Sequence, residues 1–236
     1  MTSFPMSNRH LGTSSPARRD LTAAAEVASR DLVIAAAGEL IRESGYSALT
    51  VDDVRLRAGV SRATFYFYFR NKTHLLISTA STVMDELFEV AGKNYPERDE
   101  FARIVLANVA YLSVWLRQSA ILGEFYALSL VDSEVRENYA SYRDKFEARI
   151  TGRLARLLEQ GRIPRCSPAL LAASLSSMVE FSAFRFFCYA GDPISGGRSF
   201  TDLVETLSES WYRAVYGKMP GYEYDYAQHE PEVGQA

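Results

Sequence analysis

Signals that start and stop helices are crowded between Thr50 and Asn71, and they constrain the fold more than any other feature of the chain. Thr50 can cap a helix while Asp53, three residues later, reaches back to the cap in a capping box. Gly59 then stands at the usual C-terminal position, and Ser61 can cap a second helix. Asn71 opens a third helix. Two helices this short, joined by a tight turn, predict a helix-turn-helix.

The rest of the chain has helical periodicity, as in the apolar stripe of Val33, Ala36, Ala37, Leu40 and Ile41. No run of alternating strand residues bounded by hairpin turns interrupts the pattern. We therefore predict an all-α protein of about nine helices. The predicted helices span residues 25–44, 51–58, 62–69, 71–93, 100–116, 119–130, 133–160, 167–190 and 200–216.

The chain divides into four predicted segments. Residues 1–24 lack periodicity and predict a flexible N-terminal arm, and residues 218–236 predict a flexible acidic tail. Between them lie a helix-turn-helix domain over residues 25–74 and a helical body over residues 75–217. Hydrophobic residues make up 47% of the 236 residues, which is enough apolar material to bury a core.

The cysteines and the apolar stretches bear on where the protein resides. Cys166 and Cys188 have no CxxC spacing, so they predict neither a disulfide framework nor a zinc site. The first thirty residues lack the apolar core of a signal peptide. The longest apolar stretch, residues 168–190, carries Glu180 and Arg185, which is unlike a membrane span. We expect a cytoplasmic protein with no metal, no cofactor and no membrane partner.

Charge and the second motif helix both indicate a nucleic-acid partner. Residues 1–76 hold ten Lys/Arg and seven Asp/Glu, whereas the remaining residues hold sixteen and twenty-two. In a DNA-binding helix-turn-helix the second helix enters the major groove N-terminus first, where Arg62 can form two hydrogen bonds to a guanine. The hydroxyls of Thr64, Tyr66 and Tyr68, and the Lys72 ammonium, can bind phosphates.

A longer pattern contains these residues and reads Gly45-Tyr46-(x3)-Thr50-Val51-x-Asp53-Val54-(x3)-Ala58-Gly59-Val60-Ser61-x-x-Thr64-Phe65-Tyr66-x-x-Phe69-x-x-Lys72-x-x-Leu75-Leu76. Together with the stripe from Val33 to Ile41, it resembles the N-terminal signature of the tetracycline-repressor (TetR) family, and the second motif helix is most similar to that of a mycobacterial member. The resemblance implies a homodimeric transcriptional repressor. Such a protein binds palindromic, double-stranded operator DNA and is released by a hydrophobic small-molecule effector.

The resemblance also assigns contacts within the motif. It implies that Arg62 and Ala63 face bases, and that the DNA backbone is faced by Thr50, Ser61, Thr64, Tyr66, Tyr68 and Lys72. Two positions depart from the family pattern, because Arg55 stands where a small Ala is usual and Tyr68 stands where many members have His. Arg55 puts the close packing of the two motif helices in doubt unless it points outward to a phosphate. We include Arg55 and Phe67 among the candidate DNA contacts.

Aromatic residues at helical spacing in the body fit either a core or an elongated apolar ligand cavity between helices. Their positions resemble the pocket lining of the mycobacterial member, which accepts hydrophobic ligands. Glu180 lies amid apolar neighbours, where it either anchors a polar ligand group or pairs with an arginine across a dimer. The candidate ligand-binding residues are Tyr111, Trp115, Tyr139, Phe146, Ile150, Glu180, Phe184 and Trp211.

The last two predicted helices are expected to form the dimer contact, since family members pair them as a four-helix bundle. The candidate dimer residues are Leu171, Ser174, Leu175, Met178, Leu203, Leu207 and Ala214.

The sequence gives less support to an enzyme, a carrier or an activator. His10, His74 and His229 form no catalytic set, so we do not expect an enzyme. A carrier of lipids or other hydrophobic ligands is an alternative, although the first helix lacks the Lys/Arg-rich face of an interfacial helix. Activation instead of repression is the alternative within the family.

Overall fold

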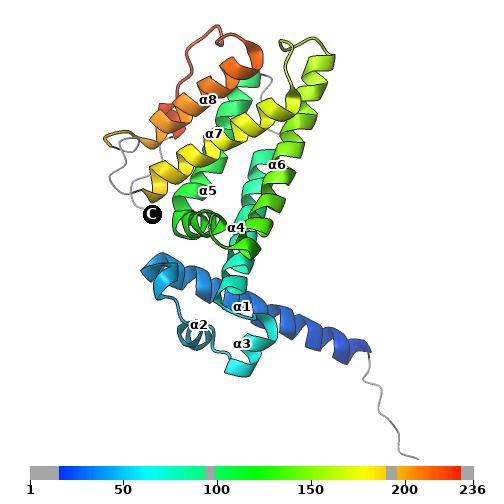
Figure 1. Cartoon of the computed structure of the whole chain (residues 1–236), viewed down its shortest axis with the longest axis vertical. Helices are drawn as coiled ribbons and strands as arrows, with labels where there is room; N and C mark the ends of the chain where they lie inside the picture. The colour runs from blue at the N-terminus through cyan, green and yellow to red at the C-terminus, as the bar shows by residue number, and fades with distance from the viewer. Residues whose placement is uncertain (1–15, 94–98, 190–195, 230–236) are drawn as a thin grey trace, which may run out of the picture.

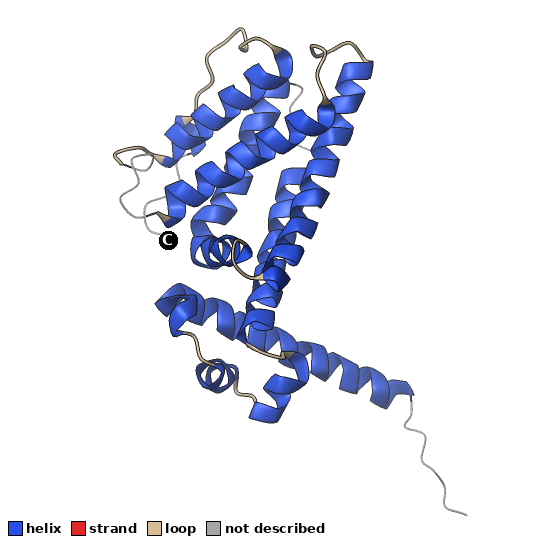
Figure 2. Cartoon of the chain, in the orientation of Figure 1, coloured by secondary structure: helices blue, strands red, loops and turns tan. Residues whose placement is uncertain are grey.

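The computed structural model describes residues 16–93, 99–189 and 196–229, and these ranges contain helices and no strand (Figure 2). The predicted all-α class is confirmed. The helices are α1 (Pro16–Ala48), α2 (Val51–Ala58), α3 (Arg62–Tyr68), α4 (Lys72–Gly92), α5 (Glu100–Ser129), α6 (Ser133–Glu159), α7 (Pro168–Cys188), α8 (Phe200–Tyr216) and the short 3₁₀-helix η1 (Ala227–His229).

Helices α1 to α3 form a small unit at one end of the molecule, and we call it the N-terminal unit (Figure 1). The apolar stripe predicted for the first helix is its inner face, because Val33, Ala36, Ala37 and Ile41 are all buried. This face lets α1 pack against α2, α4 and α5. The backbone of α1 leaves helical geometry at Gly45 (φ 79°), where the sequence predicted the helix to stop.

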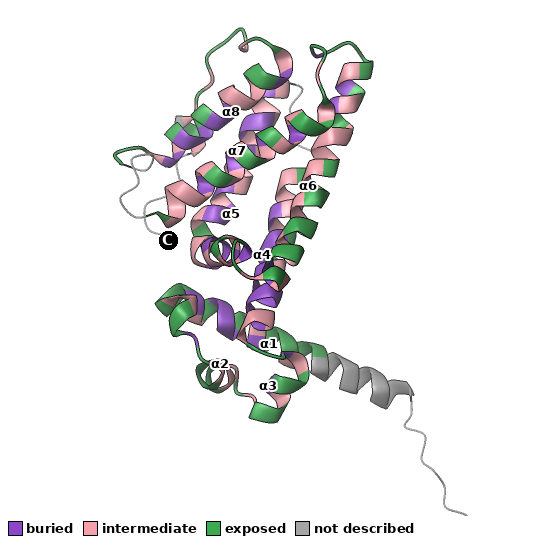
Figure 3. Cartoon of the chain, in the orientation of Figure 1, coloured by how far each residue is buried: buried purple, intermediate pink, exposed green. Residues whose placement is uncertain are grey.

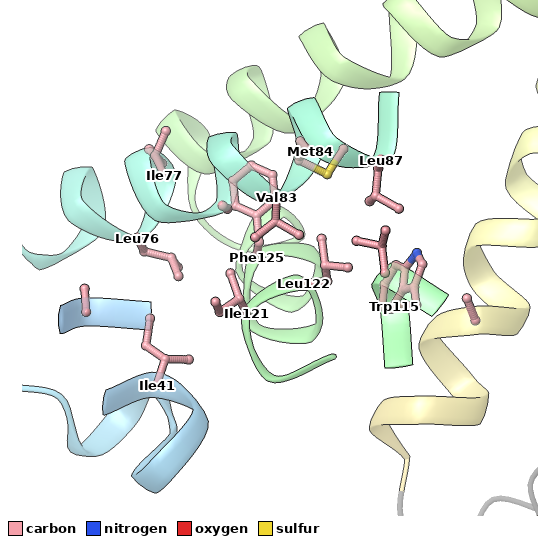
Figure 4. Close-up of a cluster of buried hydrophobic side chains, with 14 of the residues drawn as sticks. Ile41, Leu76, Ile77, Val83, Met84, Leu87, Trp115, Ile121, Leu122 and Phe125 are labelled. Carbon is pink, nitrogen blue, oxygen red and sulfur yellow. The ribbon is translucent and has the colours of Figure 1, made fainter. Parts of the chain in front are cut away.

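Helix α4 leads from the N-terminal unit into the body, where α5 packs against α1, α4, α6, α7 and α8 (Figure 1). Buried residues gather on the faces that these helices turn toward one another (Figure 3). One apolar core runs through both parts of the molecule, and it includes Ile41 of α1, Leu76 of α4 and Ile121 of α5 (Figure 4). The N-terminal unit is therefore anchored by shared packing as well as by the chain.

Helix α5 differs from the prediction. The helices expected over residues 100–116 and 119–130 are one helix with a kink at Gln118 (φ −120°, ψ 17°). The side-chain carbonyl of Gln118 accepts a hydrogen bond of 3.1 Å from Arg42 of α1, so the kink lies where α5 meets the N-terminal unit. The described ranges consequently hold eight α-helices instead of about nine.

Both predicted flexible ends are partly structured. Helix α1 begins at Pro16, so residues 16–24 of the predicted arm are helical, while residues 1–15 lie outside the described residues. Near the other end, Tyr222, Tyr224 and Tyr226 surround the buried ring of Phe101, with centroid distances of 6.3, 5.8 and 6.5 Å. The contacts of these rings with Phe101 offset part of the entropy lost by ordering the segment. Residues 230–236 of the predicted tail lie outside the described residues.

Two helices, α5 and α7, are long and apolar enough to cross a membrane by length and composition alone. In the structure both pack among the other helices, α5 against α1, α4, α6, α7 and α8, and α7 against α5, α6 and α8.

Candidate nucleic-acid interface and internal cavity

The turn between α2 and α3 has the capped geometry that the sequence predicts. The Thr50 hydroxyl oxygen accepts the Asp53 backbone N–H at 3.1 Å, and the Ser61 hydroxyl oxygen accepts the Thr64 N–H at 3.0 Å. Gly59 has the left-handed conformation (φ 68°, ψ 28°) that ends α2. One detail differs from the expected capping box, because the Asp53 carboxylate accepts from the Thr50 hydroxyl.

Arg55 does not disturb the packing of α2. Its Nε donates to the Asp52 carboxylate at 2.6 Å, so the guanidinium lies along the outside of the helix. The inward position is taken by Val54, which is fully buried, and the inward faces of α3 and the following turn are taken by Phe65 and Phe69. The Arg55 hydrogen bond lowers the pKa of the Asp52 carboxyl, so the two side chains remain a charged pair.

Most of the predicted DNA contacts, on α3 and at the caps of α2 and α3, face solvent. Thr50, Ser61, Arg62 and Ala63 are exposed, and Thr64 and Tyr68 are half-buried. Tyr66 and Phe67 are large side chains with exposed fractions of 46% and 71%, which packing within this chain does not explain. Arg62 extends from the N-terminal end of the helix, with a long ion-pair contact of 3.9 Å to Asp52 and its guanidinium 5.8 Å from the centre of the Tyr66 ring.

Lys72 is placed differently from the other predicted contacts. Its ammonium donates to the Ser47 carbonyl oxygen at 3.1 Å and lies 4.2 Å from the centre of the Tyr46 ring. Burial lowers the pKa of this ammonium. The side chain thus joins the start of α4 to the end of α1, and a phosphate would have to share the ammonium with the Ser47 carbonyl.

The body holds a partly open cavity of about 340 Å³ between α4, α5, α6, α7 and α8. Of the eight candidate ligand residues, five line this cavity: Tyr111, Phe146, Ile150, Glu180 and Trp211. The other three do not. Trp115 is fully buried in the core, Tyr139 lines a separate hollow with Arg143 and Glu147, and Phe184 packs on Tyr126 with ring centres 4.5 Å apart.

The charge of the lining is a feature that the sequence analysis missed. Six cationic side chains line the cavity, and they are Lys93, Arg103, Arg143, Arg149, Arg153 and Arg156. Three of them, Arg149, Arg153 and Arg156, lie four and three residues apart on α6, so they share one face of the helix. That spacing is visible in the sequence and is the signal that would have found them.

Glu180 is the one carboxyl group among the residues that line this cavity. Burial raises the pKa of this carboxyl, and the Tyr139 hydroxyl and the Arg143 guanidinium offset the effect only in part. The Glu180 charge in turn helps burial to raise the pKa of the Tyr111 hydroxyl. The cavity lining therefore combines a carboxyl group of raised pKa with aromatic and aliphatic side chains.

The residues predicted for a dimer contact divide into two groups. Leu175, Leu203 and Leu207 have exposed fractions of 3%, 6% and 3%, so they belong to this chain's own core and leave almost no area for a partner. At these three positions, the apolar stripe that we predicted for the dimer contact is the face that α7 and α8 turn toward the core. Leu171 and Met178 are half-buried, and Ser174 and Ala214 are exposed.

Comparison with known proteins shows which proteins this chain is similar to. Residues 33–79 match the family model described as bacterial regulatory proteins, tetR family. The regulator EthR of Mycobacterium tuberculosis H37Rv is 26% identical over 194 residues, which is 80% of this chain and 88% of EthR. EthR of Mycolicibacterium smegmatis is 28% identical over 80% of this chain and 86% of its own length.

Solved structures share the fold. A TetR-family transcriptional regulator from Streptomyces coelicolor superimposes with a TM-score of 0.62 at 16% identity, covering 79% of each chain. The family model, the curated relatives and the fold agree with the signature read in residues 33–76. The chain thus carries a segment that matches the TetR family at residues 33–79, and over 80% of its length it is similar to the transcriptional regulator EthR.

Proposed function

We propose that the protein is a homodimeric repressor that binds a palindromic operator through α3 and is released when a small molecule occupies the cavity of the body. The observation that carries the DNA-binding part is the outer face of α3. It presents Arg62, Ala63, Tyr66 and Phe67 to solvent while Phe65 is buried beneath them. A guanidinium at the start of a recognition helix can reach base edges, and the aromatic residues behind it lie toward the backbone of the groove.

The dimer part of the proposal rests on an apolar surface that this chain leaves uncovered. Leu170 and Phe181 of α7 have exposed fractions of 72% and 50%, and Ser174 and Ser177 lie exposed between them at helical spacing. These four residues share one face of α7, which we call the α7 outer face. Its pairing with a second copy would place two α3 helices on one duplex, as a twofold-symmetric operator requires.

The effector part rests on the cavity and on α4. One face of α4 lies in the core shared with the N-terminal unit, and its last turn borders the cavity. A ligand that fits only one arrangement of the body would change operator affinity by its difference in affinity for the two arrangements. Such a protein works where the operator DNA is, in the cytoplasm of its bacterium.

Selection of bound duplexes from random DNA tests this function. The wild-type chain, Arg62→Ala and the control Arg57→Ala are compared at two salt concentrations. Arg57 is a suitable control because Glu39 and Glu43 hold its guanidinium on the side of α1. We expect the wild type and Arg57→Ala to enrich one palindrome. Arg62→Ala should lose about 1–3 kcal/mol of discrimination at particular base pairs. Absence of any enriched sequence with the wild type would refute DNA-sequence recognition.

A further inference from the structure

The cavity that we assign to the effector has a positively charged lining, whereas the sequence predicted an apolar one. Six cations and a single carboxyl group, Glu180, line it. A lining of this charge repels a cationic ligand and attracts an anionic one.

The ion pairs of the body neutralise only part of this charge. Arg143 pairs with Glu147, and the one carboxylate of Glu100 serves Arg103, Arg153 and Arg162 together. Those three guanidiniums carry more positive charge than Glu100 can neutralise. An anion at this end of the cavity would therefore add an attraction that the folded chain does not supply to itself.

Two arginines of the lining have no acidic partner in the described part of the chain. Arg149 donates to the Phe88 carbonyl oxygen and stacks on the Phe88 ring, 3.4 Å from its centre, and burial lowers the pKa of the Arg149 guanidinium. Arg156 makes no ion pair within the described ranges. In addition, the Nε of Arg103 is a buried donor without an acceptor among the described residues, which is costly unless a ligand supplies one.

Most of the remaining lining is apolar. Met84, Ile104, Phe146, Ile150, Val179 and Trp211 contribute it. A volume of about 340 Å³ suits a small ligand with an aliphatic or aromatic body. The lining thus combines the arginines of α6 and of the start of α5 with apolar side chains from all five helices.

We propose that the cavity binds an amphipathic anion, whose carboxylate or phosphate group is held by Arg149, Arg156 and Arg103 and whose apolar chain lies among Phe146, Ile150 and Trp211. This inference rests on the proposed function and names the chemical class of its effector. It also gives Arg149 a second role, because its guanidinium contacts the last turn of α4. Gly92 makes that contact possible, since a Cβ there would collide with the guanidinium. An anion that draws Arg149 away from Phe88 would loosen the end of the helix that leads to the N-terminal unit.

Binding of matched twelve-carbon probes to the full chain tests the proposal. Dodecanoate, dodecyl phosphate and dodecan-1-ol are titrated below their aggregation limits by calorimetry, with tryptophan fluorescence as a second readout because Trp211 lines the cavity. We expect at least one anion to bind about 10-fold or more tightly than the alcohol. The tighter of the two anions identifies the head group as a carboxylate or a phosphate. Equal or tighter binding of the alcohol, or no binding of either anion, overturns the proposal.

Variants locate the charge. Arg149→Gln and Arg156→Gln should each weaken binding of the anion about 10-fold while leaving that of the alcohol unchanged. Lys145→Gln is the matched control, because it removes one cation from the same helix at an exposed position outside the cavity lining. Equal weakening by Lys145→Gln would mean that the anion responds only to overall charge, and would overturn the site.

A further variant keeps the proposal testable if the Arg149 variant fails to fold. Ile150→Trp should fill the cavity and abolish binding of the anion, and undiminished binding would place the probe elsewhere and refute the site. All these titrations are done without DNA. A chain that binds the anion but selects no operator would refute the repressor proposal alone, whereas the reverse result would refute only the anionic effector.

Discussion

Single residues decide how the N-terminal unit presents its charge. Asp52 holds Arg55 at 2.6 Å on the outside of α2 and approaches Arg62 only to 3.9 Å. Arg55 is thereby removed from the packing of the two motif helices, where a large cation would have been costly. Arg62 keeps its donors available, since an exposed ion pair of that length contributes little. A long side chain at an unusual position can therefore be accommodated when a carboxylate three residues earlier draws it outward.

Glu180 gives a prediction about pH. Burial raises its pKa in the folded chain above the value in the unfolded chain, so the folded state holds the proton more tightly. The stability that this group contributes is present below its unfolded pKa and is lost as the pH rises through the folded pKa. Glu180→Gln should therefore flatten the decline of stability in that window. It should also stabilise the protein at pH 7 by on the order of 1 kcal/mol.

Urea unfolding from pH 4 to pH 8 measures this effect as the difference between variant and wild type. Glu159→Gln serves as the control, because Glu159 is exposed at the end of α6. A wild-type-like pH profile for Glu180→Gln would show that the carboxyl is ionised without cost in the folded chain.

At the scale of elements, the angle between α2 and α3 depends on the backbone at Gly59. Its φ of 68° lies in the left-handed region, and its N–H closes the end of α2 on Arg55 and Leu56 carbonyl oxygens. No atom lies within 4 Å of the position where a Cβ would stand, so a side chain there has space and meets only backbone strain.

Gly59→Ala should therefore destabilise the protein by about 1 kcal/mol through backbone strain alone. Gly59→Asn should cost less, because Asn tolerates the left-handed conformation better than Ala. Thermal unfolding of both variants checks the order. An Ala variant as stable as the wild type would mean that the turn relaxes to another conformation, in which case operator binding should fall instead.

At the scale of the whole molecule, the α7 outer face determines the proposed assembly. Leu170→Asp places a charge at its most exposed apolar residue and should convert a dimer into a monomer, as light scattering after gel filtration would show. Operator affinity should fall with it, because two linked α3 helices bind one duplex far more tightly than one. Val131→Asp is the matched control, since Val131 is equally apolar and 77% exposed but lies between α5 and α6. A monomeric wild type, or a dimer that survives Leu170→Asp, would remove this face from the proposal.

The shared core couples the position of the body to that of the N-terminal unit. One cluster contains side chains from three helices, namely Ile41, Leu76 and Ile121. A displacement of α4 is therefore transmitted directly to α1. The domain boundary that we predicted between residues 74 and 75 falls within the first turn of α4, which belongs to both parts. Close packing transmits such shifts because a filled core has little room to absorb them.

The sequence by itself determined the local structure of this protein. Caps at Thr50, Ser61 and Asn71, the stop at Gly59 and the stripe on α1 depend on residues a few positions apart, so they could be read directly and the structure has them. The tertiary structure decided which of two plausible faces turns inward. Leu203 and Leu207, predicted for the dimer face, are buried in the core of this chain. Trp115 and Phe184, predicted for the cavity, pack against other side chains outside its lining. The arginines of α6 line the cavity. Helical period reveals that a helix has an apolar face, but only the neighbouring helices determine what that face, and the charges beside it, will meet.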